Sequence, residues 1–158
     1  MRHRSPPAVP PPGSLGARLV NLLAAANVHA YRLSGGRIGG RMGRAPVLLL
    51  EHVGRRSGKR RVVPLLYLAD GKNLVIVASR GGSDATPAWW HNLRAAPATT
   101  VEVGREHRAV LARQAPPEER AQLWPRLVEM YPDYATYQGR TEREIPVIVL
   151  EPRAASVS

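Results

Sequence analysis

A series of short apolar runs, separated by tight turns, constrains the fold of this chain more than any other feature. The runs lie at 47–53, 60–68, 74–79, 99–103, 107–113 and 145–151. Apolar runs of this length predict strands, and the Asp70-Gly71 and Gly104-Arg105 turns predict hairpins. Because no strand–helix–strand alternation and no GxGxxG motif occurs, a Rossmann domain is not expected. The predicted class is mainly β (α+β): an antiparallel β-barrel of about six strands with peripheral helices.

Helices are predicted before, between and after these strands. They lie at 14–33, 87–95, 117–130 and 133–138. Pro87 suits the first turn of a helix, and Asp133 suits the positively polarised end of one. The chain of 158 residues has the length of one domain. The predicted parts are a proline-rich disordered tail (1–13), an amphipathic helix (14–34), a barrel domain (35–152) and a second disordered tail (153–158).

The first helix carries an apolar face whose partner the sequence leaves open. The residues that recur at helical spacing on this face are Leu15, Leu19, Leu22, Leu23, Ala26, Ala30 and Leu33. Arginines and His29 interrupt the span, so it is not a transmembrane helix, and it lacks the cleavage site of a secretory signal. Packing of this face on the barrel is the commoner arrangement. Because no acidic residue precedes Glu51, peripheral contact with an anionic membrane is the alternative.

The net charge of +11 and the absence of cysteine narrow the possible functions. Disulfides, thiolate metal sites and a catalytic thiol are excluded, and no metal site is expected. A basic surface attracts anions such as phosphates, acidic lipid headgroups or nucleic acid. Nucleic-acid binding is not expected, because aromatic residues do not cluster among the arginine runs. The chain is expected in the cytoplasm, possible contact with the inner face of the membrane is left open, and so is the choice between monomer and dimer.

The densest candidate site is the turn GRRSGKRR at 54–61. Five cations and a hydroxyl stand beside two glycines there. Arginine supplies paired donors, and backbone N–H groups freed by glycine add a nest for an anion. This pattern predicts capture of a phosphate or a carboxylate. The alternative is a solvated hairpin tip, which is what most basic runs are.

A second candidate lies where an apolar strand runs into Ser79-Arg80-Gly81-Gly82. This sequence places a hydroxyl and a cation at the rim of a barrel, and its glycines permit close approach of a ligand. An ordinary glycine loop is the alternative interpretation.

Two aromatic clusters complete the candidates. Trp89 and Trp90 are adjacent on a predicted helix, so one is expected to pack inward while the other meets solvent or a ligand. His91 is interpreted as structural or solvent-facing. Tyrosines at three-residue spacing share one side of another helix, where they can flank a planar ring or pack on the barrel. They are Tyr131, Tyr134 and Tyr137.

The order of five motifs carries a resemblance to a known family. The motifs GRRSGKRRVVPL, VASRGG, PAWWHNL, YPDYATYQ and IPVIVLEP resemble those of the deazaflavin-dependent nitroreductase family, within the split β-barrel superfamily that binds flavins and coenzyme F420. The resemblance extends from about residue 35 to residue 152. It implies a split barrel and an enzyme that transfers a hydride from reduced F420 to an organic acceptor, such as a quinone, an enone or a nitro compound. The alternatives are an FMN-binding oxidoreductase of the same superfamily and a non-catalytic F420-binding protein.

The resemblance also implies roles for single residues. The basic turn would hold the phosphate and glutamate tail of the cofactor, and Trp89 would abut its ring. The implied cofactor-binding residues are Arg55, Arg56, Ser57, Lys59, Arg60, Pro64, Ala78, Ser79, Arg80, Gly81, Trp89 and Tyr137. The tyrosines would line the acceptor pocket, and the product would be protonated by Tyr131, Tyr134, Ser79 or a water. Glu51-His52-Val53 stands where relatives have threonines, and Trp90 where tyrosine is frequent, so the acceptor stays open.

Overall fold

The computed structural model describes residues 14–154, and the strands of this part form one antiparallel sheet of eight strands. They are β1 (Arg41–Met42), β2 (Ala45–Val53), β3 (Arg60–Leu66), β4 (Leu68–Asp70), β5 (Asn73–Val77), β6 (Ala98–Val103), β7 (Glu106–Gln114) and β8 (Val147–Pro152). The strand order is β1-β2-β6-β7-β8-β5-β4, and β3 pairs with the other edge of β2. The expected tails at 1–13 and, in part, at 153–158 lie outside the described residues.

The strands close into a barrel because the segment that carries β3 and β4 bends at Tyr67. On one side of the bend β3 pairs with β2, and on the other β4 pairs with β5. The Tyr67 amide donates to the Pro46 carbonyl at 3.0 Å, which holds the bend against the start of β2. The predicted antiparallel barrel is confirmed. The expected count of six differs because the run at 60–68 is two strands and the two-residue β1 was not foreseen.

Alternate residues of β2 serve two separate cores. Leu48 and Leu50 are buried inside the barrel with Trp90, whereas Leu49 is buried with Tyr31 against the first helix. Successive side chains of a strand point to opposite faces, so a strand covered on both faces needs a continuous apolar run. This double burial is the reason for the unbroken sequence VLLL at 47–50.

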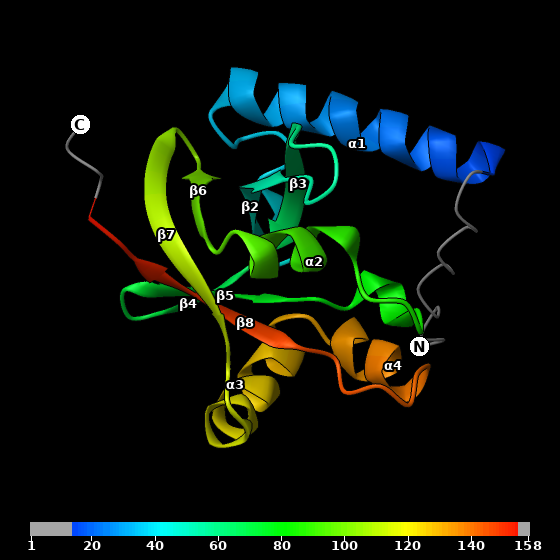
Figure 1. Cartoon of the computed structure of the whole chain (residues 1–158), viewed down its shortest axis with the longest axis vertical. Coiled ribbons are helices and arrows are strands. Elements are labelled where there is room, and N and C mark those ends of the chain that lie inside the picture. The colour runs from blue at the N-terminus through cyan, green and yellow to red at the C-terminus, as the bar shows by residue number, and fades with distance from the viewer. Residues whose placement is uncertain (1–13, 155–158) are drawn as a thin grey trace.

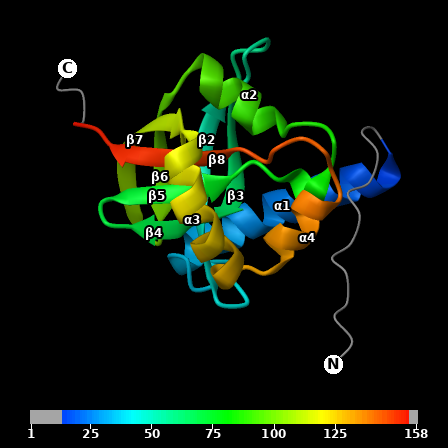
Figure 2. The ribbon, with the colours of Figure 1, turned by 90° about the horizontal axis from the view of Figure 1, so that it is seen from below.

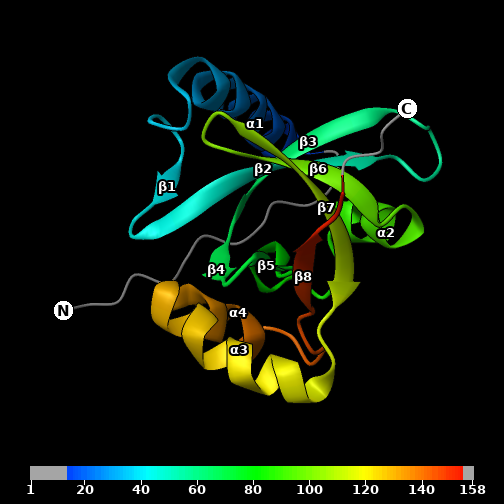
Figure 3. The same ribbon diagram turned by 90° about the vertical axis from the view of Figure 1, so that its left-hand side faces the viewer.

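The helices cover two opposite sides of the barrel (Figure 1, Figure 3). They are α1 (Leu15–Ser34), the 3-10 turn η1 (Arg80–Gly82), α2 (Ala88–Ala95), α3 (Pro117–Met130) and α4 (Asp133–Gly139). α1 lies across β2 and β3, while α3 and α4 lie at the far side. Figure 2 shows α3 in front of β5 and β8, onto which it packs Leu123 and Leu127. The site described below opens between these two sides.

α1 does not pack on the barrel through its leucine face, which was one of the two arrangements that the sequence left open. Leu15 and Leu33 are 83% and 84% exposed, and the described leucines between them are exposed as well. The helix is held instead by its last turns, where Val28 and Tyr31 are buried. The Tyr31 hydroxyl donates to the Val47 carbonyl at 3.0 Å and accepts from a backbone amide of the β6–β7 turn at 2.7 Å. The N-terminal half consequently extends beyond the other described elements on that side (Figure 1).

An ion pair completes this anchor. The Arg32 guanidinium donates to the carboxylate of Glu102, with its closest contact at 2.8 Å. Glu102 is only 6% exposed, so its charge needs this partner. Within residues 14–154, no helix is long and apolar enough to cross a membrane.

Candidate functional site

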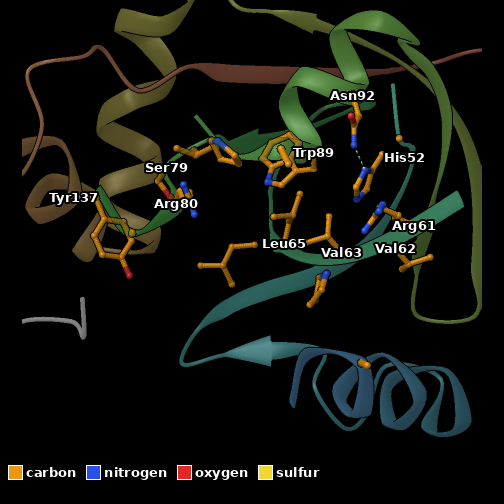
Figure 4. A pocket seen from close by; sticks show the side chains of 18 of the residues that line it. His52, Arg61, Val62, Val63, Leu65, Ser79, Arg80, Trp89, Asn92 and Tyr137 are labelled. Carbon is orange, nitrogen blue, oxygen red and sulfur yellow. Dashed lines mark hydrogen bonds between the residues drawn. The ribbon is translucent and has the colours of Figure 1, made fainter. Parts of the chain in front are cut away.

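A cavity of about 1020 Å³ lies between the barrel and the helices on either side (Figure 4). This volume is at the upper end of the range for small-molecule sites, about 300–1,000 Å³, and suits an extended ligand. The cavity has a cationic end, an apolar middle and a tyrosine end. Its walls come from β2, β3, the turn between them, the loop around η1, α2 and α4, and Ala25 of α1 also contributes.

The cationic end is the basic turn between β2 and β3. Arg55, Arg56 and Ser57 line the cavity, as does Arg61 at the start of β3. The turn is closed by the Gly58 amide, which donates to the Gly54 carbonyl at 2.8 Å. Gly58 has a φ of +69°, a conformation that favours glycine. The turn thus presents four polar side chains to the cavity.

Three members of the expected cofactor-binding set do not line the cavity. Lys59 and Arg60 are exposed at the turn, and neither lines the cavity. Ala78 is fully buried and belongs to the barrel core instead. The remaining nine cofactor-binding candidates do line the cavity: Arg55, Arg56, Ser57, Pro64, Ser79, Arg80, Gly81, Trp89 and Tyr137.

Beside the turn, two buried polar residues of the cavity wall contact each other. His52 of β2 is 8% exposed and Asn92 of α2 is 5% exposed. The Asn92 side-chain nitrogen lies 3.0 Å from His52 Nδ1, and its oxygen accepts from the Arg55 backbone amide at 3.1 Å (Figure 4). Burial, and secondly the charge of Arg61, lower the pKa of His52, so the imidazole is neutral at neutral pH.

The middle of the cavity is apolar and flat-sided. Trp89 lies opposite Val63 and Leu65 of β3, with Pro64 between them in the sequence (Figure 4). Trp89 and Trp90 are both buried in the barrel core, and their rings meet edge to face with centroids 6.4 Å apart. The predicted division is met only in part, because Trp90 packs inward while Trp89 packs in the core and also lines the cavity. An indole opposite aliphatic side chains is a suitable environment for a planar ring.

The rim at Ser79-Arg80-Gly81 has a strained backbone. Arg80 has a φ of +45°, the only positive φ at a described residue other than glycine. Positive φ is unfavourable for a side chain and tends to persist at functional sites, where surrounding contacts enforce it. The neighbouring Gly82 packs closely against α4, where an added Cβ would lie 2.5 Å from the Tyr137 carbonyl oxygen. Glycine is therefore needed for η1 to sit against α4.

Arg143 holds this rim from behind. Its guanidinium donates to the Ser79 carbonyl at 2.9 Å and, through Nε, to the Ser83 carbonyl at 2.9 Å. It also donates to the Ala78 carbonyl at 3.3 Å. A single cation thus satisfies backbone acceptors on both sides of η1, which fixes the loop that carries Ser79 and Arg80.

The tyrosine end is a packed triad of rings. Tyr131 and Tyr134 meet edge to face with centroids 5.0 Å apart, and each lies 6.2 Å from Tyr137. The Tyr131 and Tyr137 hydroxyls are 3.4 Å apart. Burial raises the pKa of Tyr134, and burial together with the Tyr137 hydrogen bond raises that of Tyr131. Both hydroxyls therefore keep their protons at neutral pH.

The fold and the cavity define an oxidoreductase of the split-barrel type, with a long site that is cationic at one end. The chain belongs to the F420H(2)-dependent quinone reductase family, whose model matches residues 23–152. The recognised superfamily and fold class are thereby confirmed.

Relatives and solved structures agree with this assignment. A protein of Mycobacterium tuberculosis provisionally named an F420H(2)-dependent quinone reductase is 49% identical over 108 residues, which cover 68% of this chain and 91% of the relative. Another from the same species, named an F420H(2)-dependent quinone reductase, is 41% identical over 127 residues, 78% of this chain and 85% of its own. A solved F420-H2-dependent reductase is similar with a TM-score of 0.62 at 39% identity, covering 67% of this chain and 94% of that one. A structure described as a domain-swapped dimer is similar with a TM-score of 0.65 at 32% identity. The match covers 84% of this chain and 99% of that one.

Sequence reasoning missed several residues of the site. His52 was noted only as a departure from relatives, and Arg61 was counted among the cations of the basic turn but not among the cofactor-binding residues. Asn92 and Arg143 were not singled out. An isolated asparagine on an amphipathic helix has no spacing signal, because its role depends on which distant turn it meets. Arg143 follows no motif, yet its carbonyl contacts span more than 50 residues of sequence.

Proposed function

We propose that this chain is an F420H2-dependent reductase that passes a hydride to a quinone-type acceptor. One observation carries the proposal: a single cavity joins a cluster of arginines to an apolar slot and then to a tyrosine triad. The family and the relatives described above are named for F420H2, which supports this cofactor and gives FMN no support.

The residues present fit such a cofactor. F420 carries a phosphodiester, several carboxylates and a planar deazaflavin ring. Arg55, Arg56 and Ser57 would hold the anionic tail with charge-assisted hydrogen bonds, and Arg61 would add its charge. Trp89, opposite β3, would contact the ring. Lys59 and Arg60 would act at longer range, as charges that attract the tail to the turn.

The bound cofactor supplies a hydride, so the protein has to provide orientation, exclusion of water and a proton. The apolar middle would exclude water and accommodate the planar groups of the cofactor and the acceptor. We assign the proton to the Tyr131 hydroxyl, since the Tyr137 hydroxyl lies within reach to replace it. Tyr134, 4% exposed, supports both rings by packing, and Ser79 would orient the ring from the rim.

A fluorescence titration of the purified chain tests the cofactor. F420 is expected to bind with micromolar or tighter affinity, and FMN and NADPH at least tenfold more weakly, because the arginines match a long anionic tail. FMN binding tighter than F420 binding would contradict the proposal.

We further propose that α1 touches an anionic membrane, from which a hydrophobic quinone would enter the cavity. The support is the exposed leucine face of α1, together with exposed arginines on α1 and in the segment that follows it. The leucines are Leu15, Leu19, Leu22 and Leu23, and the arginines are Arg18, Arg37, Arg41 and Arg44. Each arginine near such a surface contributes about 1 kcal/mol. Ala25 of the same helix lines the cavity, so the proposed contact lies beside the site.

Co-sedimentation with liposomes tests this contact. The chain is expected to pellet with phosphatidylglycerol vesicles at low salt, to be released by added salt, and to ignore phosphatidylcholine vesicles. The triple variant Leu19→Ser/Leu22→Ser/Leu23→Ser should stay in the supernatant, whereas Leu111→Ser, at an exposed leucine of β7, should behave as the parent. Equal pelleting of parent and triple variant would contradict a role for α1.

A further inference from the structure

The side chain of Asn92 connects the basic turn to the interior of the protein. Its oxygen accepts from two donors of Arg55: the backbone amide at 3.1 Å and the guanidinium at 3.4 Å. Its nitrogen lies 3.0 Å from His52 Nδ1. Asn92 and His52 belong to α2 and β2, which pack firmly in the barrel, whereas Arg55 lies on an exposed turn.

These contacts fix which nitrogen of His52 carries the hydrogen. Both Arg55 groups are donors, so the acceptor atom of the Asn92 amide has to face them. The amide nitrogen of Asn92 therefore faces His52 and donates, and His52 Nδ1 has to accept. A neutral imidazole that accepts at Nδ1 carries its hydrogen on Nε2. The orientation of the Asn92 amide and the form of His52 thus specify each other.

We infer that His52 and Asn92 are positioning residues that set the geometry of the basic turn for anion binding. This inference rests on the proposed function, in which the turn grips the anionic tail of the cofactor. Neither the arginine run nor the glycines of the turn identify this pair, and His52 stands where related sequences are expected to have threonine.

The physical need for such a pair follows from the charges of the turn. Cations on adjacent residues repel one another, and a turn with two glycines has many conformations in the absence of other contacts. Ordering it on binding would cost conformational entropy and would weaken affinity. Asn92 holds Arg55, the first cation of the turn, before any ligand binds. Arg56 and Ser57 therefore already face the cavity.

The neutral form of His52 is part of the arrangement. Arg61 of β3 is the cross-strand partner of His52, and Arg55 contacts the other end of the Asn92 side chain. Cations therefore lie on both sides of His52. A proton on Nδ1 would set a donor against the Asn92 N–H, and Asn92 would have to rotate and leave Arg55. Burial and Arg61 oppose that protonation by lowering the pKa of His52.

F420 titrations of single variants test the inference through its consequence for binding. Asn92→Ala is expected to weaken F420 about tenfold to thirtyfold, since two hydrogen bonds that order the turn are lost. His52→Phe should weaken it about threefold to tenfold, and His52→Gln, which can still accept from Asn92, should restore most of the loss. The matched control is His91→Phe on α2, a histidine outside the cavity wall, which should bind as the parent does.

A double-mutant cycle separates positioning from a merely structural role. In the Asn92→Ala background, Arg56→Ala should weaken F420 less than it does in the parent, because the misplaced turn already holds the anion poorly. Additive losses for Asn92 and Arg56, which do not touch, would overturn the inference.

Two measurements need no cofactor and keep this inference separate from the proposed function. In the parent, the imidazole nitrogen shifts should identify His52 as the Nε2–H form, and the Arg55 amide should exchange slowly with solvent. In Asn92→Ala that amide should exchange much faster. Unchanged Arg55 exchange would overturn the present inference whether or not F420 binds, whereas a parent that fails to bind F420 contradicts the proposed function.

Discussion

The two ends of the cavity are built in opposite ways. At the cationic end, exposed arginines stand on a short turn that one buried asparagine holds. At the other end, aromatic rings are packed together, and Arg143 fixes the neighbouring loop through backbone carbonyls. An exposed cluster of charge suits capture of a variable, hydrated anionic tail. A packed aromatic end suits chemistry that depends on placement of a hydroxyl within a fraction of an ångström. Binding and catalysis should therefore respond separately to substitution.

Removal of a hydroxyl at the tyrosine end is expected to have the largest effect on turnover. Tyr131→Phe keeps the ring and its packing but loses the proton that we assign to the product. Turnover should fall about a hundredfold, in the range found for general acid catalysts, while F420 affinity stays within a factor of three. Steady-state kinetics beside a binding titration measures both. Tyr134→Phe is the matched variant of the same triad. An equal loss of turnover in this variant would contradict the assignment of Tyr131 as the proton donor.

Loss of charge at the exposed end should act on binding instead. Arg56→Ala removes a charge-assisted contact of about 1.5–3 kcal/mol, so F420 affinity should fall about tenfold to a hundredfold. Because the site is exposed, the affinity of the parent should also fall as salt rises. Lys59→Ala, at a residue outside the cavity wall, should cause a smaller loss. If Arg56→Ala left affinity unchanged with the fold intact, the turn would be only a solvated hairpin tip.

Arg143, which lies behind the rim, is expected to stabilise the fold as well as to position the loop that carries Ser79 and Arg80. Arg143→Met keeps much of the aliphatic stem but leaves the Ser79 and Ser83 carbonyls without their guanidinium partner. The free energy of unfolding should decrease by about 2 kcal/mol, measured by urea denaturation. An unchanged midpoint and slope would mean that solvent replaces these contacts at no cost.

A smaller effect should appear as pH falls. Because burial and Arg61 lower the pKa of His52 below 6.5, the unfolded chain takes up a proton at a higher pH than the folded protein does. The contribution of neutral His52 to stability is complete above pH 6.5 and decreases as pH falls below this value. Between pH 7 and pH 5, the parent should lose more stability than His52→Gln. Parallel curves for the two proteins would show that His52 does not titrate differently on folding.

The sequence predicted the barrel well because its signals are local. The hairpin at Gly104-Arg105 and the limits of α3 follow from turn chemistry and periodicity within a few residues, and both are confirmed. The partner of the α1 face stayed open because periodicity reveals an apolar stripe without revealing what covers it. Val28 and Tyr31, between the leucines in sequence, are the apolar residues of α1 that are buried against the barrel.

The sequence predicted most residues that line the site but not the hydrogen bonds that join distant residues within it. The structure brings the rings of Tyr131, Tyr134 and Tyr137 together as predicted, although Tyr131 follows the end of α3 and does not lie on α4 with the other two. The Asn92–His52 pair could not be foreseen, because it joins positions 40 residues apart whose proximity depends on the tertiary fold. The same holds for Arg143 and the rim. Side-chain contacts between distant elements need the packed structure before they can be recognised.

The most direct test of the account is the oxidation of reduced F420 by a quinone in the presence of the purified protein. Mixed with F420H2 and a soluble naphthoquinone, the parent protein should restore the absorbance of oxidised F420 over many turnovers, and NADPH should not replace F420H2. Tyr131→Phe should bind F420H2 and oxidise it about a hundredfold more slowly. If the parent binds F420H2 tightly but leaves it reduced with naphthoquinone, enone and nitro acceptors alike, the protein is a carrier of the cofactor and the account of catalysis is wrong.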